Sequence, residues 1–228
     1  MSITGERDDK PGGGPQKVGV PIIDIMIVMY ATVAILAALA RRNQTGQGEV
    51  IDIAMLDVCA ALLVNQGMNH LLSGITPSRM GNCHPNIQPQ DVFDCRNGQV
   101  VIAVGNDGQY VKLCEAIGRP DLASDTRFAI NPQRIRYLPV LLETLRARFR
   151  EIDASALAAA LDAAGVSCAT INDIPGVLAD PQIQAREVLR HIPHSQGGTV
   201  PEIVSPMRFR NAPLRFDRPP PLLGQHTQ

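Results

Sequence analysis

Residues 17–42 read KVGVPIIDIMIVMYATVAILAALARR and decide the fold of the chain, because they predict one long apolar helix with a single carboxylate at its head. The stretch 25–40 contains sixteen residues without a charge. The two arginines that follow would complement the helix dipole in the last turn. The sequence therefore predicts a helix over Ile25–Arg42, with Asp24 in the position of an N-cap.

The Asp24 carboxylate is either a helix cap or a catalytic group. An ionised carboxylate is costly in apolar surroundings unless something pairs with it, so such a group is rarely kept for packing alone. A carboxylate can act as a nucleophile toward an activated acyl group where water is excluded. The sixteen uncharged residues fall short of the roughly 20 that cross a bilayer. We therefore expect a buried core helix and no membrane span.

Composition excludes several classes of protein. The chain has 228 residues and a formal net charge of −1, so it lacks the basic excess of a surface for nucleic acid or for an anionic membrane. Its five cysteines are odd in number and form no C-x-x-C pair, which predicts neither a disulfide framework nor a zinc site. Reduced thiols and the absence of a signal-peptide pattern favour a cytoplasmic protein.

Helical and strand patterns alternate along the rest of the chain, which predicts the α/β class. The expected strands cover 49–56, 99–104 and 167–171, and short β-type runs follow in 188–216. The expected helices cover 57–72, 107–117 and 155–164, and another begins at Asn131-Pro132 and is broken at Pro139. A loop rich in Gly, Pro, Ser and Asn, 73–89, separates the first helices from the remainder.

Few groups could carry out chemistry. The glycine-rich turns form neither a P-loop nor G-x-G-x-x-G, and no G-x-S-x-G nucleophile elbow occurs. Pro193 prevents the two histidines of HIPH from sharing a helical face, so a metal site is not expected there. Asp24 and the loop around Gly81–Pro89 remain as the candidates.

These segments resemble the class III CoA-transferase family, the group that contains formyl-CoA and carnitine CoA-transferases. The family pattern G-V-P-x-x-D, an apolar helix, R-x-x-T-G-x-G-Q and V-D-x-x-x-x-D corresponds closely to residues 19–57. Further matches are GNCHPNIQPQDVF, VIAVGNDGQYVKLCEAIGRPDLASDTRF, GVSCATINDIPGVLADPQIQAR and PPPLLGQHT. The resemblance covers nearly the whole chain in the family's order.

The resemblance implies that Asp24 is the nucleophile, which attacks an acyl-CoA, passes through a mixed anhydride and becomes an aspartyl-CoA thioester. It implies a CoA thioester as substrate with no permanently bound cofactor, a small carboxylic acid as second substrate, and an interlocked homodimer. The implied fold is a partial Rossmann-like large domain plus a small α/β domain. We expect 1–72 to belong to the large domain, 73–187 to be linker and small domain, and 188–228 to return to the large domain.

The family's mobile glycine loop falls on HPNI at 84–87, a departure that is closer to the branches that handle dicarboxylates such as succinate. Loop position and chemistry make Asn82, His84, Asn86 and Gln88 the candidates for substrate contact. Polar groups in such a loop could bind the acid.

Other departures leave two alternatives open. Val28 stands where the family usually has Gly, and Pro89-Gln90 stands where it usually has Pro-Tyr. The resemblance begins in the middle of the family pattern, so the part that makes most CoA contacts is not matched. The alternatives to a CoA-transferase are an acyl-CoA racemase of the same superfamily and a truncated, non-catalytic fragment.

Overall fold

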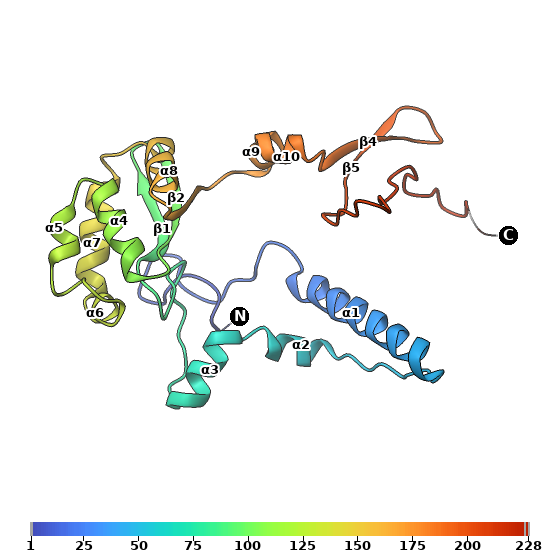
Figure 1. Cartoon of the computed structure of the whole chain (residues 1–228), viewed down its shortest axis with the longest axis horizontal. Helices are drawn as coiled ribbons and strands as arrows, with labels where there is room; N and C mark the ends of the chain where they lie inside the picture. Colours follow the sequence, from blue (N-terminus) through green and yellow to red (C-terminus); the bar gives the residue numbers. More distant parts are fainter. Residues whose placement is uncertain (1, 226, 228) are drawn as a thin grey trace. The chain divides into compact units, whose positions relative to one another are not determined.

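The computed structural model describes residues 2–225 and 227, and it divides into two compact units, Met1–Thr170 and Ile171–Gln228. Each unit is described by itself (Figure 1). The three-part division expected from the family stays a prediction.

The first helix, α1 (Ile22–Thr45), has 24 residues and is longer than predicted at both ends. Pro21 occupies the N-cap position and Asp24 lies inside the first turn, so the prediction that Asp24 caps the helix is wrong. Pro fits there because its fixed φ suits the start of a helix, and because an N–H at this position would have no intrahelical partner to donate to. At the other end, Gly46 adopts a left-handed φ of 74° and its N–H donates to the carbonyl oxygen of Arg42 at 2.8 Å.

No residue of α1 is buried, so the expectation of a buried core helix is also wrong for this chain. An apolar helix face is buried only where another apolar surface covers it, and among the described helices and strands the main contact of α1 is with the short helix α2 (Met55–Ala61). By length and composition alone α1 could cross a membrane, a test that core helices of soluble proteins and signal sequences also pass.

The predicted strand over 49–56 and the single helix over 57–72 differ from the structure. Residues 49–54 form no strand, because no neighbouring strand supplies the ladder of hydrogen bonds. The helical segment is divided into α2 and α3 (Val64–Ser73). Val64 has a φ of 42°, which is strained for a β-branched residue and marks the break.

A three-stranded antiparallel sheet forms the centre of the first unit, in the order β1 (Gln90–Cys95), β2 (Gly98–Ala103) and β3 (Ser167–Thr170). Phe93 pairs with Val100, and Ile102 pairs with Cys168. The strands predicted over 99–104 and 167–171 are confirmed to within one residue at each end. Alternate residues of β1 and β2 are buried, as expected for a sheet with one covered face.

Helices cover this sheet and complete the core. They are α4 (Asp107–Ala116), α5 (Pro120–Ser124), α6 (Asn131–Arg136), α7 (Leu138–Phe149) and α8 (Ala154–Ala163). Figure 1 shows α4, α7 and α8 beside the strands, with α7 packed on β1 and α8 packed on β2 and β3. The predicted break at Pro139 is confirmed, since α6 ends before Tyr137 and Pro139 lies in the first turn of α7.

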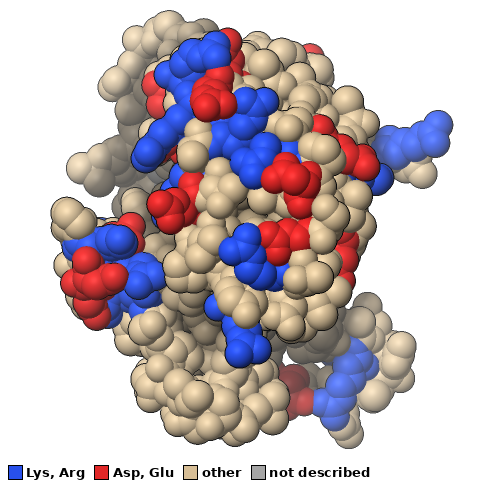
Figure 2. Space-filling model, turned by 90° about the vertical axis from the view of Figure 1, so that its left-hand side faces the viewer, with Lys and Arg blue, Asp and Glu red and all other residues tan. Residues whose placement is uncertain are grey.

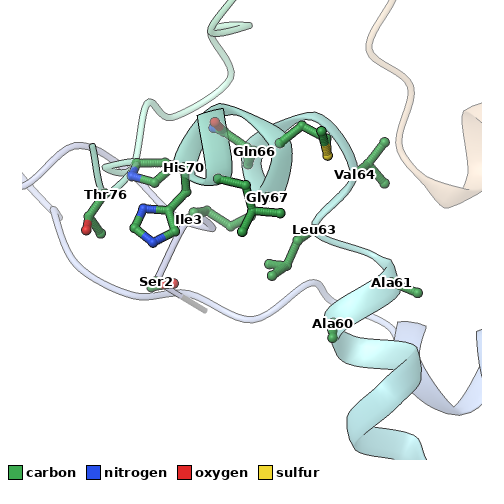
Figure 3. Close-up of a pocket in the computed structure, with 13 residues that line it drawn as sticks. Ser2, Ile3, Ala60, Ala61, Leu63, Val64, Gln66, Gly67, His70 and Thr76 are labelled. Atoms are coloured by element: carbon green, nitrogen blue, oxygen red, sulfur yellow. The ribbon is translucent and has the colours of Figure 1, made fainter. Parts of the chain in front are cut away.

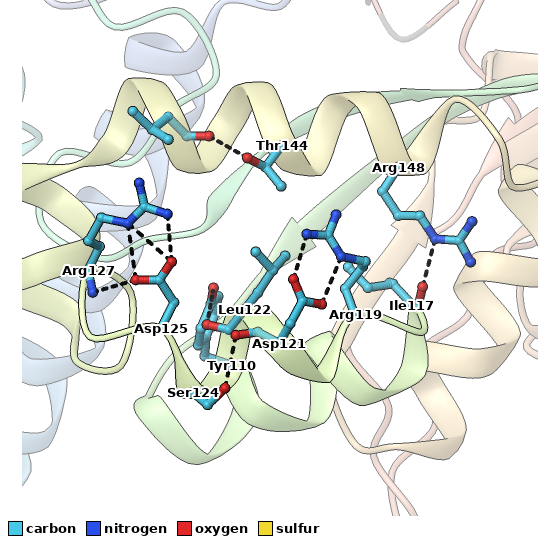
Figure 4. Close-up of polar contacts among 11 residues, drawn as sticks. Tyr110, Ile117, Arg119, Asp121, Leu122, Ser124, Asp125, Arg127, Thr144 and Arg148 are labelled. Atoms are coloured by element: carbon cyan, nitrogen blue, oxygen red, sulfur yellow. Dashed lines mark hydrogen bonds and ion pairs between the residues drawn. The ribbon is translucent and has the colours of Figure 1, made fainter.

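Charged side chains of both signs are interspersed over the face of the molecule drawn in Figure 2. On the first unit, Arg119 and Asp121 pair at 2.7 Å, and Arg127 and Asp125 pair at the same distance. Figure 4 shows both pairs as two-pronged contacts between near neighbours on exposed turns. Such exposed pairs contribute little to stability.

The second unit contains two short helices, α9 (Ile174–Ala179) and α10 (Pro181–Ala185), and a hairpin of β4 (Leu189–Pro193) with β5 (Thr199–Ile203). The side chains of Asp173 and Asp180 cap the two helices. The short β-type runs expected in this region thus correspond to one antiparallel hairpin.

Candidate active site

Asp24 lines an open hollow of about 650 Å³ at the start of α1. The other walls come from the residues that precede the helix, including Lys17, and from the end of α2 and the turn after it, with Cys59, Leu62 and Leu63. The side chain is exposed and close to apolar groups on one side. A ligand could therefore approach the carboxylate from solvent and pack an apolar portion against the leucines.

The Asp24 carboxylate has no hydrogen-bond or ion-pair partner within the described part of the chain. The positive end of the helix dipole lies at the first turn and favours negative charge there. The free backbone N–H groups of a helix start can also stabilise an oxyanion that develops nearby. The carboxylate is thus free to react, in a place where a developing anion is favoured.

The loop predicted to contact substrate has a defined internal structure. His84 Nδ1 accepts hydrogen bonds from the backbone N–H groups of Asn86 and Ile87, both at 3.1 Å. In a neutral ring the proton is then on Nε2. The imidazole closes the loop on itself and leaves the Nε2–H as the group available to a ligand.

Asn86 joins this loop to α3. Its side-chain amide makes a reciprocal pair with that of Asn69, at 3.1 and 3.2 Å. Asn65 Nδ2 also donates to Asn86 Oδ1, at 3.4 Å. These contacts anchor the loop to α3, which begins directly after Leu63.

Gln88 lies inside the loop, where its side chain is completely buried. Its Nε2 donates to the carbonyl oxygen of His84 and to Cys83 Sγ, and its Oε1 accepts from the N–H of Gln90. Burial raises the pKa of the Cys83 thiol, which keeps it neutral. In this structure Gln88 supports the loop, and a direct contact with substrate stays a prediction.

Asn82 lines a different hollow, of about 640 Å³, together with Lys10, Asp91 and Arg146. Arg146 donates to the buried carboxyl of Asp91 at 3.2 Å, yet burial still raises the pKa of Asp91. Asp24 and Asn82 thus line two different hollows.

A third hollow, of about 550 Å³, is apolar (Figure 3). It lies between the start of the chain and α3, with Ile3, Leu63 and Val64 among its walls. His70 is the titratable side chain among its described lining residues, and its Nδ1 donates to the carbonyl oxygen of Ile75 at 3.2 Å. This hollow presents no pair of groups suited to acid–base chemistry.

Sequence patterns did not point to the residues that hold the loop. Asn131, Arg134 and Asp107 contact it or one another across 24 to 46 residues of sequence. The Asn131-Pro132 pair indicated only the start of a helix. Among the residues that the structure describes, no three or more His, Cys, Asp or Glu side chains are grouped so that they could hold a metal ion.

The chain belongs to the CoA-transferase family III, whose model matches residues 1–227. It is 39% identical over 226 residues to the succinate–glutarate CoA-transferase of Agrobacterium fabrum, covering 99% of this chain and 56% of that protein. It is 34% identical to the succinyl-CoA:mesaconate CoA-transferase of Haloarcula hispanica, with 99% and 56% covered. The chain thus spans about half the length of the curated relatives it matches.

Solved structures confirm the expected fold class. A CAIB/BAIF family protein from Brucella suis is 41% identical, has a TM-score of 0.76, and is matched over 99% of this chain and 57% of that one. Rv3272 from M. tuberculosis is 28% identical, with a TM-score of 0.81 over 95% of this chain and 57% of that one. The chain therefore has the α/β fold of this family over the part that it covers.

Proposed function

We propose that this chain forms part of an enzyme that transfers coenzyme A between an acyl-CoA and a dicarboxylic acid, with Asp24 as the nucleophile. The observation that carries the proposal is the exposed, unpartnered carboxylate in the first turn of α1, within a sequence that the family model matches throughout. The names of the relatives support a dicarboxylate, since they mention succinate, glutarate and mesaconate.

The proposed reaction begins when an Asp24 carboxylate oxygen attacks the thioester carbonyl carbon. The C–S bond breaks, CoA leaves as a thiolate and an acyl–aspartyl anhydride remains. The thiolate then attacks the aspartyl carbonyl carbon, which releases the first acid as a carboxylate and gives an aspartyl-CoA thioester. The second acid repeats these steps in reverse order, so CoA leaves on it and the Asp24 carboxylate is restored.

The environment of Asp24 suits this sequence. Each attack passes through a tetrahedral oxyanion, which the start of a helix stabilises. Lys17 on the wall of the same hollow provides a positive charge for the anionic parts of CoA. The loop would supply the contacts to the acid, through Asn82, His84 and Asn86, while the buried Gln88 would keep the loop in shape.

The test incubates the protein, purified from its native source, with succinyl-CoA and measures its intact mass. We expect a CoA adduct that hydroxylamine removes and that peptide mapping places on Asp24. Asp24→Asn should abolish both the adduct and the transfer, because an amide cannot attack the thioester, while the fold is retained because Asp24 makes no hydrogen bond in the described structure.

Asp162→Asn is the matched control, since Asp162 is an exposed carboxylate on α8 and lines none of the hollows described above. It should retain both adduct and transfer. An adduct on another residue, or undiminished transfer by Asp24→Asn, would refute the assignment. Racemisation of a 2-methylacyl-CoA without exchange of CoA would support the racemase alternative, and absence of either reaction would support the non-catalytic one.

The cytoplasmic location, the homodimer and the absence of a membrane span remain parts of this proposal. Interspersed charges on the face drawn in Figure 2 are in keeping with a protein that meets small molecules and not nucleic acid.

A further inference from the structure

The side-chain amide of Asn131 makes hydrogen bonds to the main chain of the loop 82–88 on either side of Ile87. Its Nδ2 donates to the carbonyl oxygen of Asn86 at 2.8 Å, and its Oδ1 accepts from the N–H of Gln88 at 2.9 Å. A single amide thus satisfies two backbone groups of a segment that belongs to no strand there. The loop is held where an unsupported loop would be mobile.

Arg134, one turn further along α6, holds the next backbone group of the same loop. This guanidinium is completely buried, and its Nε donates to the carbonyl oxygen of Gln88 at 2.7 Å. It also donates to the carbonyl oxygen of Phe128 at 2.9 Å and stacks over the ring of Tyr110 at 4.5 Å. A buried charge with this many partners is fixed in place.

Asp107 ties the two residues together at the start of α4. Its Oδ1 accepts from Arg134 Nη2 at 2.6 Å and from the backbone N–H of Asn131 at 2.9 Å. The three side chains form one connected network between two helices, and three of its hydrogen bonds end on the loop backbone between Asn86 and Gln88. The network therefore contacts the loop as well as the core residues Phe128 and Tyr110.

We propose that Asn131 and Arg134 are positioning residues, which fix the loop backbone so that His84 and Asn86 present their side chains to the acid substrate. The expected effect on the acid substrate rests on the proposed function, whereas the fixing of the loop backbone by Asn131 and Arg134 does not. Asn131 and Arg134 hold the loop backbone from α6, and Asn69 pairs with the Asn86 side chain from α3, so the loop is anchored to two helices.

The test uses Asn131→Ala, since Arg134 is so buried that its replacement could unfold the unit. The variant removes two hydrogen bonds to the loop and leaves Arg134 with its partners. Arg119→Ala is the control, because it also removes a two-pronged contact, with Asp121, on an exposed turn of the same unit. Both proteins are compared with wild type by amide hydrogen exchange and by steady-state kinetics.

We expect exchange in Asn131→Ala to become faster in peptides that cover residues 82–88, with the rest of the first unit unchanged. The KM for the acceptor acid should rise about ten-fold, which is the scale of losing one or two hydrogen bonds, while the affinity for CoA itself stays at the wild-type value. Arg119→Ala should match wild type in both measurements.

Unchanged exchange in the loop, or faster exchange throughout the unit, would contradict the proposal that Asn131 fixes the loop backbone. Faster exchange confined to the loop with an unchanged KM would overturn the positioning role. If wild type forms no CoA adduct at all, the proposed function fails, and the exchange measurement still decides whether Asn131 holds the loop.

Discussion

Asp24 and Asp91 line different hollows of the first unit, and their carboxylates have opposite surroundings. Asp24 is exposed and without a partner, whereas Asp91 is buried and hydrogen-bonded by Arg146 and by the N–H of Val92. Burial still raises the pKa of Asp91, so desolvation outweighs the nearby cation. The Asp24 carboxylate is open to solvent, whereas the contact between Arg146 and Asp91 joins α7 to β1.

The raised pKa of Asp91 makes stability depend on pH. The native state holds this proton more tightly than the unfolded chain, so the free energy of unfolding falls as the pH rises from the ordinary value of 3.8 through the raised pKa. Asp91→Asn removes that dependence. Urea unfolding from pH 4 to pH 7 should show the variant gaining stability relative to wild type as the pH increases, and a shift in the opposite direction would mean that Arg146 stabilises the ionised form.

The cysteines should differ sharply in reactivity. Cys59 is exposed in the Asp24 hollow, whereas Cys95 and Cys114 are buried and burial raises the pKa of Cys168 to about 11. At pH 8 only about one Cys168 in a thousand would be a thiolate. Iodoacetamide at pH 8, followed by peptide mass spectrometry, should label Cys59 first, and early labelling of Cys168 would contradict the packing of β3.

At the scale of elements, the parts that could be predicted are those whose partners lie within the chain. The helix over 107–117, the helix over 155–164 and the strand over 99–104 show clear patterns, and each packs into the core of the first unit. The strand expected over 49–56 has an equally clear pattern but no neighbour to pair with, so it stays extended without a ladder.

The candidate site shows the same limit. Asp24 became a candidate because a lone charge at the head of an apolar run is visible locally, but its place inside the first turn could not be predicted. The grip of Asn131 on the loop joins residues 43 and 45 apart in sequence, and nothing local marks it. The two residues between α2 and α3 are both Leu, and neither Gly nor Pro occurs there, so the sequence did not predict the break.

Helix α8 is the element whose packing is easiest to test. Leu161 is completely buried against the sheet, so Leu161→Ala should lower the free energy of unfolding by about 2–5 kcal/mol. Asp162→Ala, at the neighbouring exposed position, should change it little. Urea denaturation measures both, and equal stability of the two variants would mean that α8 does not close the core.

At the scale of the whole molecule, α1 leaves apolar side chains uncovered, including Val28 at 62% and Leu36 at 61% exposure. Exposed apolar surface of this size is unusual on a monomer. The homodimer expected for the family would give such a surface a partner, and it stays a prediction.

The chain expressed by itself should therefore associate in a concentration-dependent manner, which sedimentation velocity would detect. Val28→Lys combined with Leu36→Lys should reduce the association, because two charges would have to be desolvated in the contact. Val140→Lys, an exposed position on α7, is the control and should leave it unchanged. A monodisperse monomer at all concentrations would show that this surface does not drive association.

The ring of His84 has one further consequence. Since two backbone N–H groups occupy Nδ1, the two ring nitrogens differ in chemical state, and ¹⁵N NMR would give them widely separated chemical shifts. A loop that opened would lose this separation through exchange between tautomers. The imidazole is thus a built-in spectroscopic reporter of the loop's conformation, and it can be observed without any substrate present.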